Sequence, residues 1–464
     1  MQNPFGKKNK EKTYDVIVIG SGSGMLVVEN AIAAGLRTAL VDKGPAGGTC
    51  LNVGCIPSKM LIAAADRVME INEADRFGIA AEITHIDFPR IMAEMHSAVA
   101  PDHQRIHENL AADQRFDYYE GQAAFVDEYT LSVNETRIRG KAVFIAAGAR
   151  PLIPALEGLD QVDYLTSESL LSLKRLPERL AIIGGGYIAA EYGHFFSAMG
   201  SEVTVIQNAE RMVPREEPEI SQILQAAFSL RMTVHTNAAA RSLKKRDNGC
   251  EITVRDNPSG DTFTVHADAV LIAAGRASNA DLLQVENTGV ALDEGGFIET
   301  DGLMRTSKPG IWAFGDINGK KMFTHVSYEE AGLAWRNYQN DTTRPFDYLP
   351  TPRAVFSHPR IASVGLTEAE ARERYDNILV GHANYSDVAN GMALRDKDGV
   401  AKAIVDKSSY RILGFHIVGP HAAILIQEIV NVMALGGQLR MLAGTMHIHP
   451  ALSELILKPF GNLS

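Results

Sequence analysis

The sequence predicts an α/β fold in which two strand–turn–helix–strand units precede a separate α+β region. Three observations support this prediction. A β-branched run that ends in a glycine-rich turn occurs near the N-terminus and again close to residue 180. A helical stretch and a second short strand follow each turn. Beyond residue 346, short apolar runs alternate with two helical stretches, and 464 residues suffice for about three domains.

The first unit has the element order of a Rossmann-like dinucleotide-binding domain. A β-branched run predicts a strand over residues 14–20, a helix is expected over 24–34, and a second strand over 38–41 ends at Asp42. An acid at the end of this strand hydrogen-bonds a ribose hydroxyl in such domains. The order therefore predicts that a dinucleotide binds here.

The turn of the first unit carries residues that such binding needs. It consists of Gly20-Ser21-Gly22-Ser23-Gly24-Met25. Gly20 permits a tight turn, Gly22 lets the backbone approach a pyrophosphate, and the following helix N-terminus offers N–H groups and a positive dipole. Met25 stands where glycine or alanine is usual, so we expect looser packing between helix and strand at that point.

The second unit repeats this order. A strand is predicted over 180–183, a helix over 187–199 and another strand over 203–206. Its turn fits the fingerprint better, through Gly184, Gly186 and Ala189. A carboxylate at the end of the second strand would favour NAD and repel the 2′-phosphate of NADP, but the residue there is Gln207. We therefore expect NAD(H) or NADP(H) with a slight lean to NAD, and electron transfer between the two bound dinucleotides.

The C-terminal region is predicted to form its own α+β domain. Strands are expected over 354–356, 401–405 and 412–417, and helices over 368–375 and 422–435. This mixture differs from the βαβ order of the preceding units and predicts a separate domain.

Two of the three cysteines, Cys50 and Cys55, lie five positions apart beside glycines and predict redox chemistry. Metal-binding cysteine pairs are spaced more tightly, and no other cysteine pair completes such a site, so no metal site is expected. Residues four or five apart on a helix can meet on one face, so a disulfide is feasible. Pro57 is tolerated in a first helical turn and would put Cys55 near a helix N-terminus, whose dipole stabilises a thiolate. Cys250 is expected to be a bystander.

Near the C-terminus, His449 and Glu454 lie five positions apart in the run His-Ile-His-Pro-Ala-Leu-Ser-Glu. A carboxylate at that range can orient an imidazole and raise its basicity. Histidine also suits proton transfer near neutral pH. The alternative is that the two side chains form a hydrogen-bonded pair on the surface with no catalytic role. A redox cysteine pair needs an acid–base partner, however, which favours the catalytic interpretation.

The charge and hydrophobicity of the chain indicate which partners and which cellular location to expect. With a formal net charge of −11, the chain has no electrostatic reason to bind nucleic acid or an anionic membrane. The most apolar late stretch, 422–435, is broken by polar residues, and the first apolar run, 16–19, is too short for a signal peptide. We therefore expect a cytoplasmic protein with no nucleic-acid and no membrane partner.

Together these stretches resemble the class I pyridine nucleotide–disulfide oxidoreductases, the family of dihydrolipoamide dehydrogenase, glutathione reductase and mycothione reductase. The resemblance covers nearly the whole chain after about residue 13. The run Gly-Gly-Thr-Cys-Leu-Asn-Val-Gly-Cys-Ile-Pro-Ser-Lys, from Gly47 to Lys59, is highly specific to that family. Further matches are Ala146-Ala147-Gly148, Ile311-Trp312-Ala313-Phe314-Gly315-Asp316 and His449-Pro450.

The resemblance implies an FAD-dependent enzyme that passes electrons between NAD(P)H and a small-molecule or lipoyl disulfide. Cys55 would touch the flavin and Cys50 would exchange with the substrate, so we expect Cys50 to be the more accessible thiol. Lys59 would lie by the flavin and pair with Glu191, and Asp316 would bind the FAD ribitol.

The resemblance also implies a homodimer, because His449, oriented by Glu454, would reach the disulfide of the other subunit. The predicted fold class is then α/β, with two Rossmann-like dinucleotide-binding domains plus a C-terminal α+β dimerisation domain. The expected domains are 1–149 (FAD-binding, with the cysteine pair), 150–278 (NAD(P)-binding), 279–346 (return to the FAD-binding or central domain) and 347–464 (dimerisation).

Two sets of site residues follow from the motifs and the resemblance. The expected catalytic residues are Cys50, Cys55, His449, Glu454, Lys59 and Glu191. The expected cofactor-binding residues are Gly20, Gly22, Gly24, Asp42, Gly48, Thr49, Lys59, Gly148, Asp316, Gly184, Gly186, Ala189, Gln207 and Gly275.

Departures from the family pattern leave the substrate open. Gln207 replaces the glutamate expected of an NAD-linked dihydrolipoamide dehydrogenase, and the segment 322–327 differs from that enzyme. The activity is expected to be most like dihydrolipoamide dehydrogenase. A mycothione or other low-molecular-weight disulfide reductase and a docking subunit of a 2-oxo acid dehydrogenase complex are the alternatives. Mercuric reductase and high-molecular-weight thioredoxin reductase are disfavoured, because the chain ends Gly-Asn-Leu-Ser without their extra cysteines.

Overall fold

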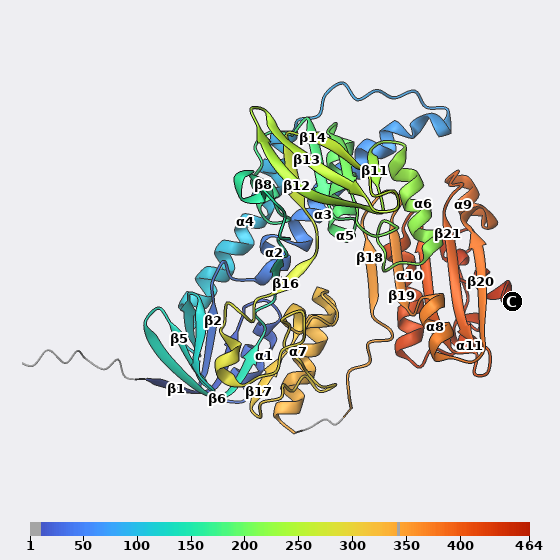
Figure 1. The fold of residues 1–464 in the computed structure, drawn as a ribbon. Helices are drawn as coiled ribbons and strands as arrows, with labels where there is room; N and C mark the ends of the chain where they lie inside the picture. Colours follow the sequence, from blue (N-terminus) through green and yellow to red (C-terminus); the bar gives the residue numbers. More distant parts are fainter. Residues whose placement is uncertain (1–10, 341–343) are drawn as a thin grey trace, which may run out of the picture. The chain divides into compact units, whose positions relative to one another are not determined.

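The computed structural model describes residues 11–340 and 344–464, which form two compact units (Figure 1). Each unit is discontinuous in sequence. The first consists of Met1–Ser58, Glu94–Leu152 and Arg276–Phe346, and the second of Lys59–Ala93, Ile153–Gly275 and Asp347–Ser464.

The first unit is built on a mixed sheet with the strand order β3-β2-β1-β6-β5-β4, in which β17 also pairs with β6. Its central strand β1 (Lys12–Ile19) runs parallel to β2 (Thr38–Asp42) and β6 (Thr136–Ile145), and Ile17 lies opposite Ala39 and Val143. The four apolar residues that end β1 are all buried, as expected for a parallel strand covered on both faces. The remaining strands are β3 (Asp117–Glu120), β4 (Ala123–Asp127), β5 (Thr130–Val133), β7 (Ala149–Pro151), β16 (Arg276–Ser278) and β17 (Ile311–Ala313).

The first helix of this unit follows the glycine-rich turn after β1, and further helices come from later parts of the chain. α1 (Gly24–Ala33) follows β1 directly, and α7 (Thr324–Tyr338) packs against α1 (Figure 1). The short α2 (Gly48–Asn52) and the first residues of α3 (Cys55–Asn72) carry the cysteine pair. The long helix α4 runs from Phe88 to Ala112.

The second unit contains a parallel sheet with the order β11-β10-β9-β15-β8. β9 (Arg179–Ile183), α5 (Tyr187–Met199) and β10 (Glu202–Ile206) form the second βαβ unit, close to the predicted bounds. An antiparallel sheet of β12 (Ala238–Arg246), β13 (Gly249–Asp256) and β14 (Thr262–Ala267) was not predicted. The other elements are β8 (Tyr164–Leu165), β11 (Thr233–His235), β15 (Ala269–Ile272) and α6 (Pro218–Ser229).

The same unit also contains the C-terminal α+β region, whose sheet has the order β18-β19-β22-β21-β20. The predicted strands and helices of this region are confirmed with small shifts of their ends, and β19 and β20 are additional. The elements are β18 (Pro352–Val355), β19 (Ile361–Gly365), α8 (Glu368–Arg374), β20 (Ile378–Asn384), α9 (Ala389–Ala393), β21 (Val400–Asp406), β22 (Ile412–Val418), α10 (Ala422–Ala434), α11 (Leu439–Ala443) and α12 (Lys458–Gly461). The predicted α/β class is confirmed, and the ranges of the four expected domains stay predictions.

One stretch, Gly48–Asn72, is long and apolar enough to cross a membrane by length and composition, with a mean hydropathy of 1.2. It comprises α2 and α3 with an interruption between Asn52 and Cys55. Core helices of soluble proteins pass the same test, so this finding is weak evidence, and the expectation of no membrane partner stays a prediction.

Candidate active site

Both glycine-rich turns use their first glycine for a close approach to a neighbouring strand end. Gly20 has φ +103°, and a Cβ there would lie 2.3 Å from the Ala146 carbonyl oxygen. Gly184 has φ +119°, and a Cβ there would lie 2.2 Å from the carbonyl oxygen of Ala273. Only glycine fits such positions, because a side chain would meet backbone atoms that cannot move away. The two turns are therefore built alike, as the fingerprints predicted.

Gly24, and not position 25, sets the packing of α1 on the first sheet. A Cβ on Gly24 would lie 2.9 Å from Cγ1 of Val18. The helix and the strand therefore approach closely one residue before Met25, so the expectation of looser packing was wrong. The fingerprint rule places the contact glycine one position later than this chain does.

Asp42 lies where the sequence placed it, at the end of β2 beside the first turn. Its Oδ2 accepts a hydrogen bond from the Ser21 N–H at 2.6 Å, and its Oδ1 accepts one from the Gly44 N–H at 2.8 Å. A carboxylate has about four acceptor positions. Asp42 can therefore hold the turn and still accept a hydrogen bond from a ribose hydroxyl.

The region around this turn fits the FAD that the resemblance implies. Gly22 faces Gly48, where a Cβ would lie 2.8 Å from the Gly22 Cα, so two backbones approach without side chains. No side chain caps the N-terminus of α1, which leaves its positive end for a pyrophosphate. Thr49 follows Gly48 in the first turn of α2, and Gly148 has φ +68° in the segment after β6.

Asp316 supplies a buried carboxylate in the same unit. Its Oδ2 lies 3.4 Å from Nε of Arg276, a nitrogen that is buried without a hydrogen-bond partner among the described residues. Burial raises the pKa of the Asp316 carboxyl, and Arg276 only partly opposes this effect. A polyol hydroxyl that donates to Asp316 would satisfy this group, so the pair fits a ribitol. The buried Glu330 holds the turn through the Gly315 N–H at 2.6 Å.

The structure brings Cys50 and Cys55 together as two thiols in hydrogen-bonding contact. Cys50 lies in α2, and Cys55 is the first residue of the 18-residue helix α3, as Pro57 predicted. Gly54 makes the approach possible, because a Cβ there would lie 2.7 Å from the Thr49 carbonyl oxygen and 3.3 Å from the Cys50 Cα. The short helix α2 and the start of the longer α3 therefore meet at the sulfur pair.

The two thiols ionise as a coupled pair. The hydrogen bond with Cys55, followed by burial, raises the pKa of the Cys50 thiol. In such a pair the first proton leaves more readily than the second. The helix N-terminus at Cys55 favours a thiolate on that sulfur, so the reduced pair is best described as a Cys55 thiolate beside a Cys50 thiol.

The expected order of accessibility was wrong for the protein chain itself. Cys55 is exposed, whereas Cys50 is only partly exposed. The physical reason is that Cys50 is enclosed by its own helix turn and by its contact with Cys55, whereas Cys55 opens a helix. A cofactor lying against Cys55 would cover it, so the roles of the two thiols stay predictions.

In the second unit, Lys59 forms the predicted pair with Glu191. The Lys59 Nζ lies 2.7 Å from Oε2 of Glu191, and the Glu191 Oε1 accepts a hydrogen bond from the Phe356 N–H at 3.0 Å. The ammonium also lies 4.7 Å from the centre of the Phe356 ring. Because Glu191 is buried on α5, its carboxylate fixes the direction in which Lys59 points.

The second glycine turn is bordered by Gln207, as predicted. The Gln207 side chain packs on Gly185, and its Nε2 donates a hydrogen bond to the Arg211 carbonyl at 3.1 Å. The Nε of Arg211 is buried without a hydrogen-bond partner among the described residues. Gly186 faces open space, the fully buried Ala189 packs α5 on the sheet, and Gly275 has φ +133°.

A buried carboxylate, Glu216, fixes the start of α5. It accepts hydrogen bonds from the Tyr187 hydroxyl, from Nε of Arg353 at 2.8 Å and from the Ser363 Oγ at 2.6 Å. Burial would raise the pKa of Glu216, but Arg353 and these hydrogen bonds outweigh that effect and lower it. The neighbouring Glu217 pairs with the buried Lys402 at 2.9 Å. Sequence reasoning missed this network, because nothing near these acids marks them as buried.

The predicted histidine–acid pair is present in the second unit. The His449 Nδ1 lies 2.9 Å from Oε1 of Glu454, and this hydrogen bond lowers the pKa of the Glu454 carboxyl. Since the acid occupies Nδ1, Nε2 is the ring nitrogen left for proton transfer. His449 is largely exposed. A second pair, His447 with Glu428 at 2.6 Å, was missed, because Glu428 lies 19 residues earlier, in α10.

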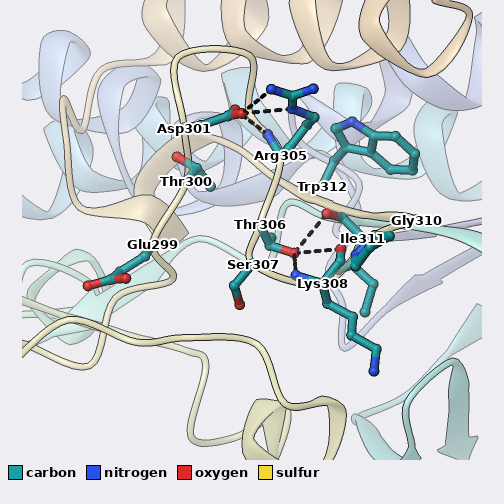
Figure 2. Close-up of a pocket in the computed structure, with 11 residues that line it drawn as sticks. Glu299, Thr300, Asp301, Arg305, Thr306, Ser307, Lys308, Gly310, Ile311 and Trp312 are labelled. Carbon is teal, nitrogen blue, oxygen red and sulfur yellow. Dashed lines mark hydrogen bonds and ion pairs between the residues drawn. The ribbon is translucent and has the colours of Figure 1, made fainter.

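The described part of the chain holds no metal-binding cluster, and a cavity in the first unit is not lined by the predicted residues. Within the described residues, no group of histidine, cysteine and acidic side chains could hold a metal ion. The first unit also contains a cavity of about 610 Å³ lined by Glu299–Asp301 and Arg305–Trp312 (Figure 2). Its cations are already paired, Arg305 with Asp301 and Lys308 with Glu128, and none of the predicted site residues lines it.

Two family models match the chain. The model described as pyridine nucleotide-disulphide oxidoreductase matches residues 14–331. The model described as pyridine nucleotide-disulphide oxidoreductase, dimerisation domain, matches residues 351–459.

Several characterised proteins are similar to the chain along its length. Mycothione reductase of Mycobacterium tuberculosis (strain ATCC 25618 / H37Rv) is 34% identical over 460 residues, covering 96% of this chain and 98% of the relative. Mercuric reductase of Streptomyces lividans is 35% identical over 453 residues, covering 96% and 94%. Dihydrolipoyl dehydrogenase of Chlamydia trachomatis is 32% identical over 453 residues, covering 96% and 95%.

A solved structure is also similar. The HOCl-induced flavoprotein disulfide reductase RclA from Escherichia coli, determined as a Cu(II) complex, matches with a TM-score of 0.85 at 29% identity. The match covers 97% of this chain and 99% of that chain.

Proposed function

The chain belongs to the pyridine nucleotide-disulphide oxidoreductase family, and from this we propose that it passes electrons between NAD(P)H and a substrate disulfide through Cys50 and Cys55. The family binds FAD and uses NAD(P)H. The observation that carries the proposal is the contact between the two thiols at the N-terminus of α3. A thiol pair held in this way can cycle between dithiol and disulfide.

The overall reaction consumes one NAD(P)H and one proton and converts one disulfide into two thiols. Bound FAD would supply the two-electron chemistry that links the nucleotide to the cysteine pair. The first glycine turn, Asp42 and Asp316 would hold it, and Lys59, fixed by Glu191, would lie by its ring. The second glycine turn, bordered by Gln207, would hold the nucleotide.

The exchange with substrate falls to the chain's own residues. Cys50, which gives up its proton to His449 as it reacts, attacks one substrate sulfur, the substrate S–S bond breaks, a mixed disulfide forms, and the first substrate thiol leaves with that proton. Cys55 then attacks Cys50, which releases the second thiol and leaves the Cys50–Cys55 disulfide. His449 moves the protons through Nε2, while Glu454 orients the ring.

We further propose a homodimer in the cytoplasm, with His449 acting on the neighbouring subunit's cysteine pair. The match to the family's dimerisation model supports the dimer. A slight preference for NAD(H) is proposed because Gln207 brings no positive charge. Arg211 could hold a 2′-phosphate instead, because among the described residues its Nε has no hydrogen-bond partner and its guanidinium makes only a long contact, 4.0 Å, with a largely exposed acid, Glu210.

Two classes of substrate are consistent with the proposed reaction. A lipoyl substrate, in the manner of dihydrolipoamide dehydrogenase, is the first, and docking within a 2-oxo acid dehydrogenase complex would be a variant of it. A mycothione-type low-molecular-weight disulfide is the second, because a mycothione reductase is 34% identical over 96% of the chain. The relatives named mercuric reductase add Hg²⁺ to the substrates that need testing.

A substrate panel tests the proposal. The FAD-loaded protein would be assayed with NADH and NADPH against lipoamide, glutathione disulfide, mycothione disulfide, coenzyme A disulfide and Hg²⁺. We expect turnover of one disulfide that is lost in Cys50→Ser. Turnover of a disulfide that survives loss of Cys50 would refute the proposed use of the pair.

A further inference from the structure

Thr324, which the sequence did not single out, places its hydroxyl at the cysteine pair. Its Oγ1 lies 3.6 Å from Sγ of Cys55, a distance at which a hydroxyl can hydrogen-bond the large sulfur atom. Thr324 also lowers the pKa of the Cys50 thiol, although Cys55 and burial raise that pKa overall. The hydroxyl therefore contacts the Cys55 sulfur and acts on the Cys50 thiol as well.

The element that carries Thr324 fixes this position. Thr324 is the first residue of the 15-residue helix α7. In the next turn, Ser327 hydrogen-bonds Ser23, the residue that precedes α1. The buried Glu330 in the same helix holds the Gly315 turn. Because α7 is tied at these points, the Thr324 hydroxyl reaches the sulfurs from a rigid element.

We propose that Thr324 is a catalytic residue that donates a hydrogen bond to the thiolate of the reduced cysteine pair and so sets how readily the pair enters exchange. This inference rests on the proposed function, because it concerns the same thiols. A hydroxyl has a single donor proton, and a thiolate accepts it more strongly than a thiol or a disulfide sulfur does. The interaction is therefore strongest in the reduced, ionised state and favours it over the others.

The position of Thr324 coincides with a departure from the family pattern. Thr324 lies within 322–327, the segment that differs from what is expected of a dihydrolipoamide dehydrogenase.

Other charged or titratable groups surround the pair and must stay constant in a test. Tyr328 lies one turn beyond Thr324 in α7, and burial, then the charge of Cys50, raises the pKa of its phenol. Glu29 of α1 acts on the same phenol. Lys59 follows Cys55 by one turn in α3, and its charge is paired with Glu191. Substitution of Thr324 alone leaves all of these groups in place.

The test compares Thr324→Val, which keeps the shape but lacks the hydroxyl, with Thr324→Ser, which keeps the hydroxyl. Each FAD-loaded protein would be reduced with dithiothreitol, freed of reductant without oxygen, and alkylated with iodoacetamide across a pH titration. Mass spectrometry would identify the cysteine that reacts. Because a hydrogen bond to a charged group is lost, we expect the alkylation midpoint to rise by about one to two pH units in Thr324→Val. Thr324→Ser should match the wild type.

Two outcomes would overturn the proposal. One is a Thr324→Val profile that superimposes on the wild-type profile. The other is an equal shift in Thr324→Ser, which would make the methyl group and not the hydroxyl responsible. Thr324→Ala replaces the valine variant if that protein does not retain FAD. Absence of turnover with every disulfide in the panel would refute the proposed function, whereas the alkylation midpoint still reports on Thr324.

Discussion

Replacement of Glu216 by glutamine removes one buried charge and should destabilise the protein markedly. The Glu216 side chain is fully buried, and its partner Arg353 is 11% exposed. The neutral amide keeps the shape, but it leaves the Arg353 guanidinium without a counter-charge. Breaking one side of a buried pair costs about 3–5 kcal/mol, and because glutamine can still accept one hydrogen bond, we expect about 3 kcal/mol.

Urea unfolding followed by circular dichroism measures this change, at fixed protein and FAD concentrations. Asp163→Asn is the matched control: Asp163 is a fully exposed acid of the same unit, 3.9 Å from Lys245. Exposed pairs contribute about 0–1 kcal/mol, so the control should remain near the wild type. A Glu216→Gln loss no larger than that of the control would refute the argument from burial.

The same substitution should change the response to acid. The pKa of Glu216 is lowered in the folded protein, so its contribution is complete above the unfolded value of about 4.3 and is lost as the pH falls through the folded value. Glu216→Gln has no such contribution to lose. The stability difference between wild type and variant should therefore shrink as the pH falls below about 4, and a constant difference would contradict the assigned pKa direction.

Three further predictions concern the reaction. His449→Gln should lower disulfide turnover by about 10²–10⁴-fold and leave flavin reduction by NAD(P)H intact in stopped-flow measurements, since His449 moves protons on thiols; slowed flavin reduction with normal turnover would contradict its role. Gln207→Glu should raise the ratio of kcat/KM for NADH to that for NADPH by about tenfold, and an unchanged ratio would mean that Gln207 does not lie at the ribose. Cys50→Ser and Cys55→Ser should each lose disulfide turnover but still reduce an artificial electron acceptor with NAD(P)H; loss of both activities would show that the thiols also support the flavin.

The sequence was sufficient for the two βαβ units, because their signals are local. A β-branched run, a glycine that tolerates positive φ and an amphipathic helix follow one another within about 30 residues, and the structure places Gly20 and Gly184 as these signals require. The antiparallel strands β12–β14 were missed, because their alternation of buried and exposed residues is weak. Their formation depends on pairing with one another, which local sequence patterns do not reveal. Met25 misled the prediction, because the glycine that matters for packing is Gly24.

The residue pattern alone predicted the parts of the candidate site whose residues lie in one short motif, and the family resemblance added the distant pair of Lys59 and Glu191. Cys50 with Cys55 and His449 with Glu454 each lie within six residues and were found. Thr324 was not found, since it comes from a helix that begins 269 residues after Cys55. The predicted order of exposure of the two thiols was wrong, because exposure depends on how each helix turn encloses its sulfur. Residue types and their spacing do not determine this.

The interleaving of the two units has a consequence for synthesis on the ribosome. β6, in the middle of the first sheet, ends at Ile145, whereas its partner β17 begins only at Ile311. The intervening chain includes β9, α5 and β10 of the second unit. At about 5–20 residues per second, β6 waits roughly ten to thirty seconds for β17. During that interval the nascent first unit presents an incomplete sheet with apolar residues and unpaired backbone groups. We therefore expect the speed of translation over residues 146–311, and the access of chaperones to the nascent chain, to affect the yield of folded protein.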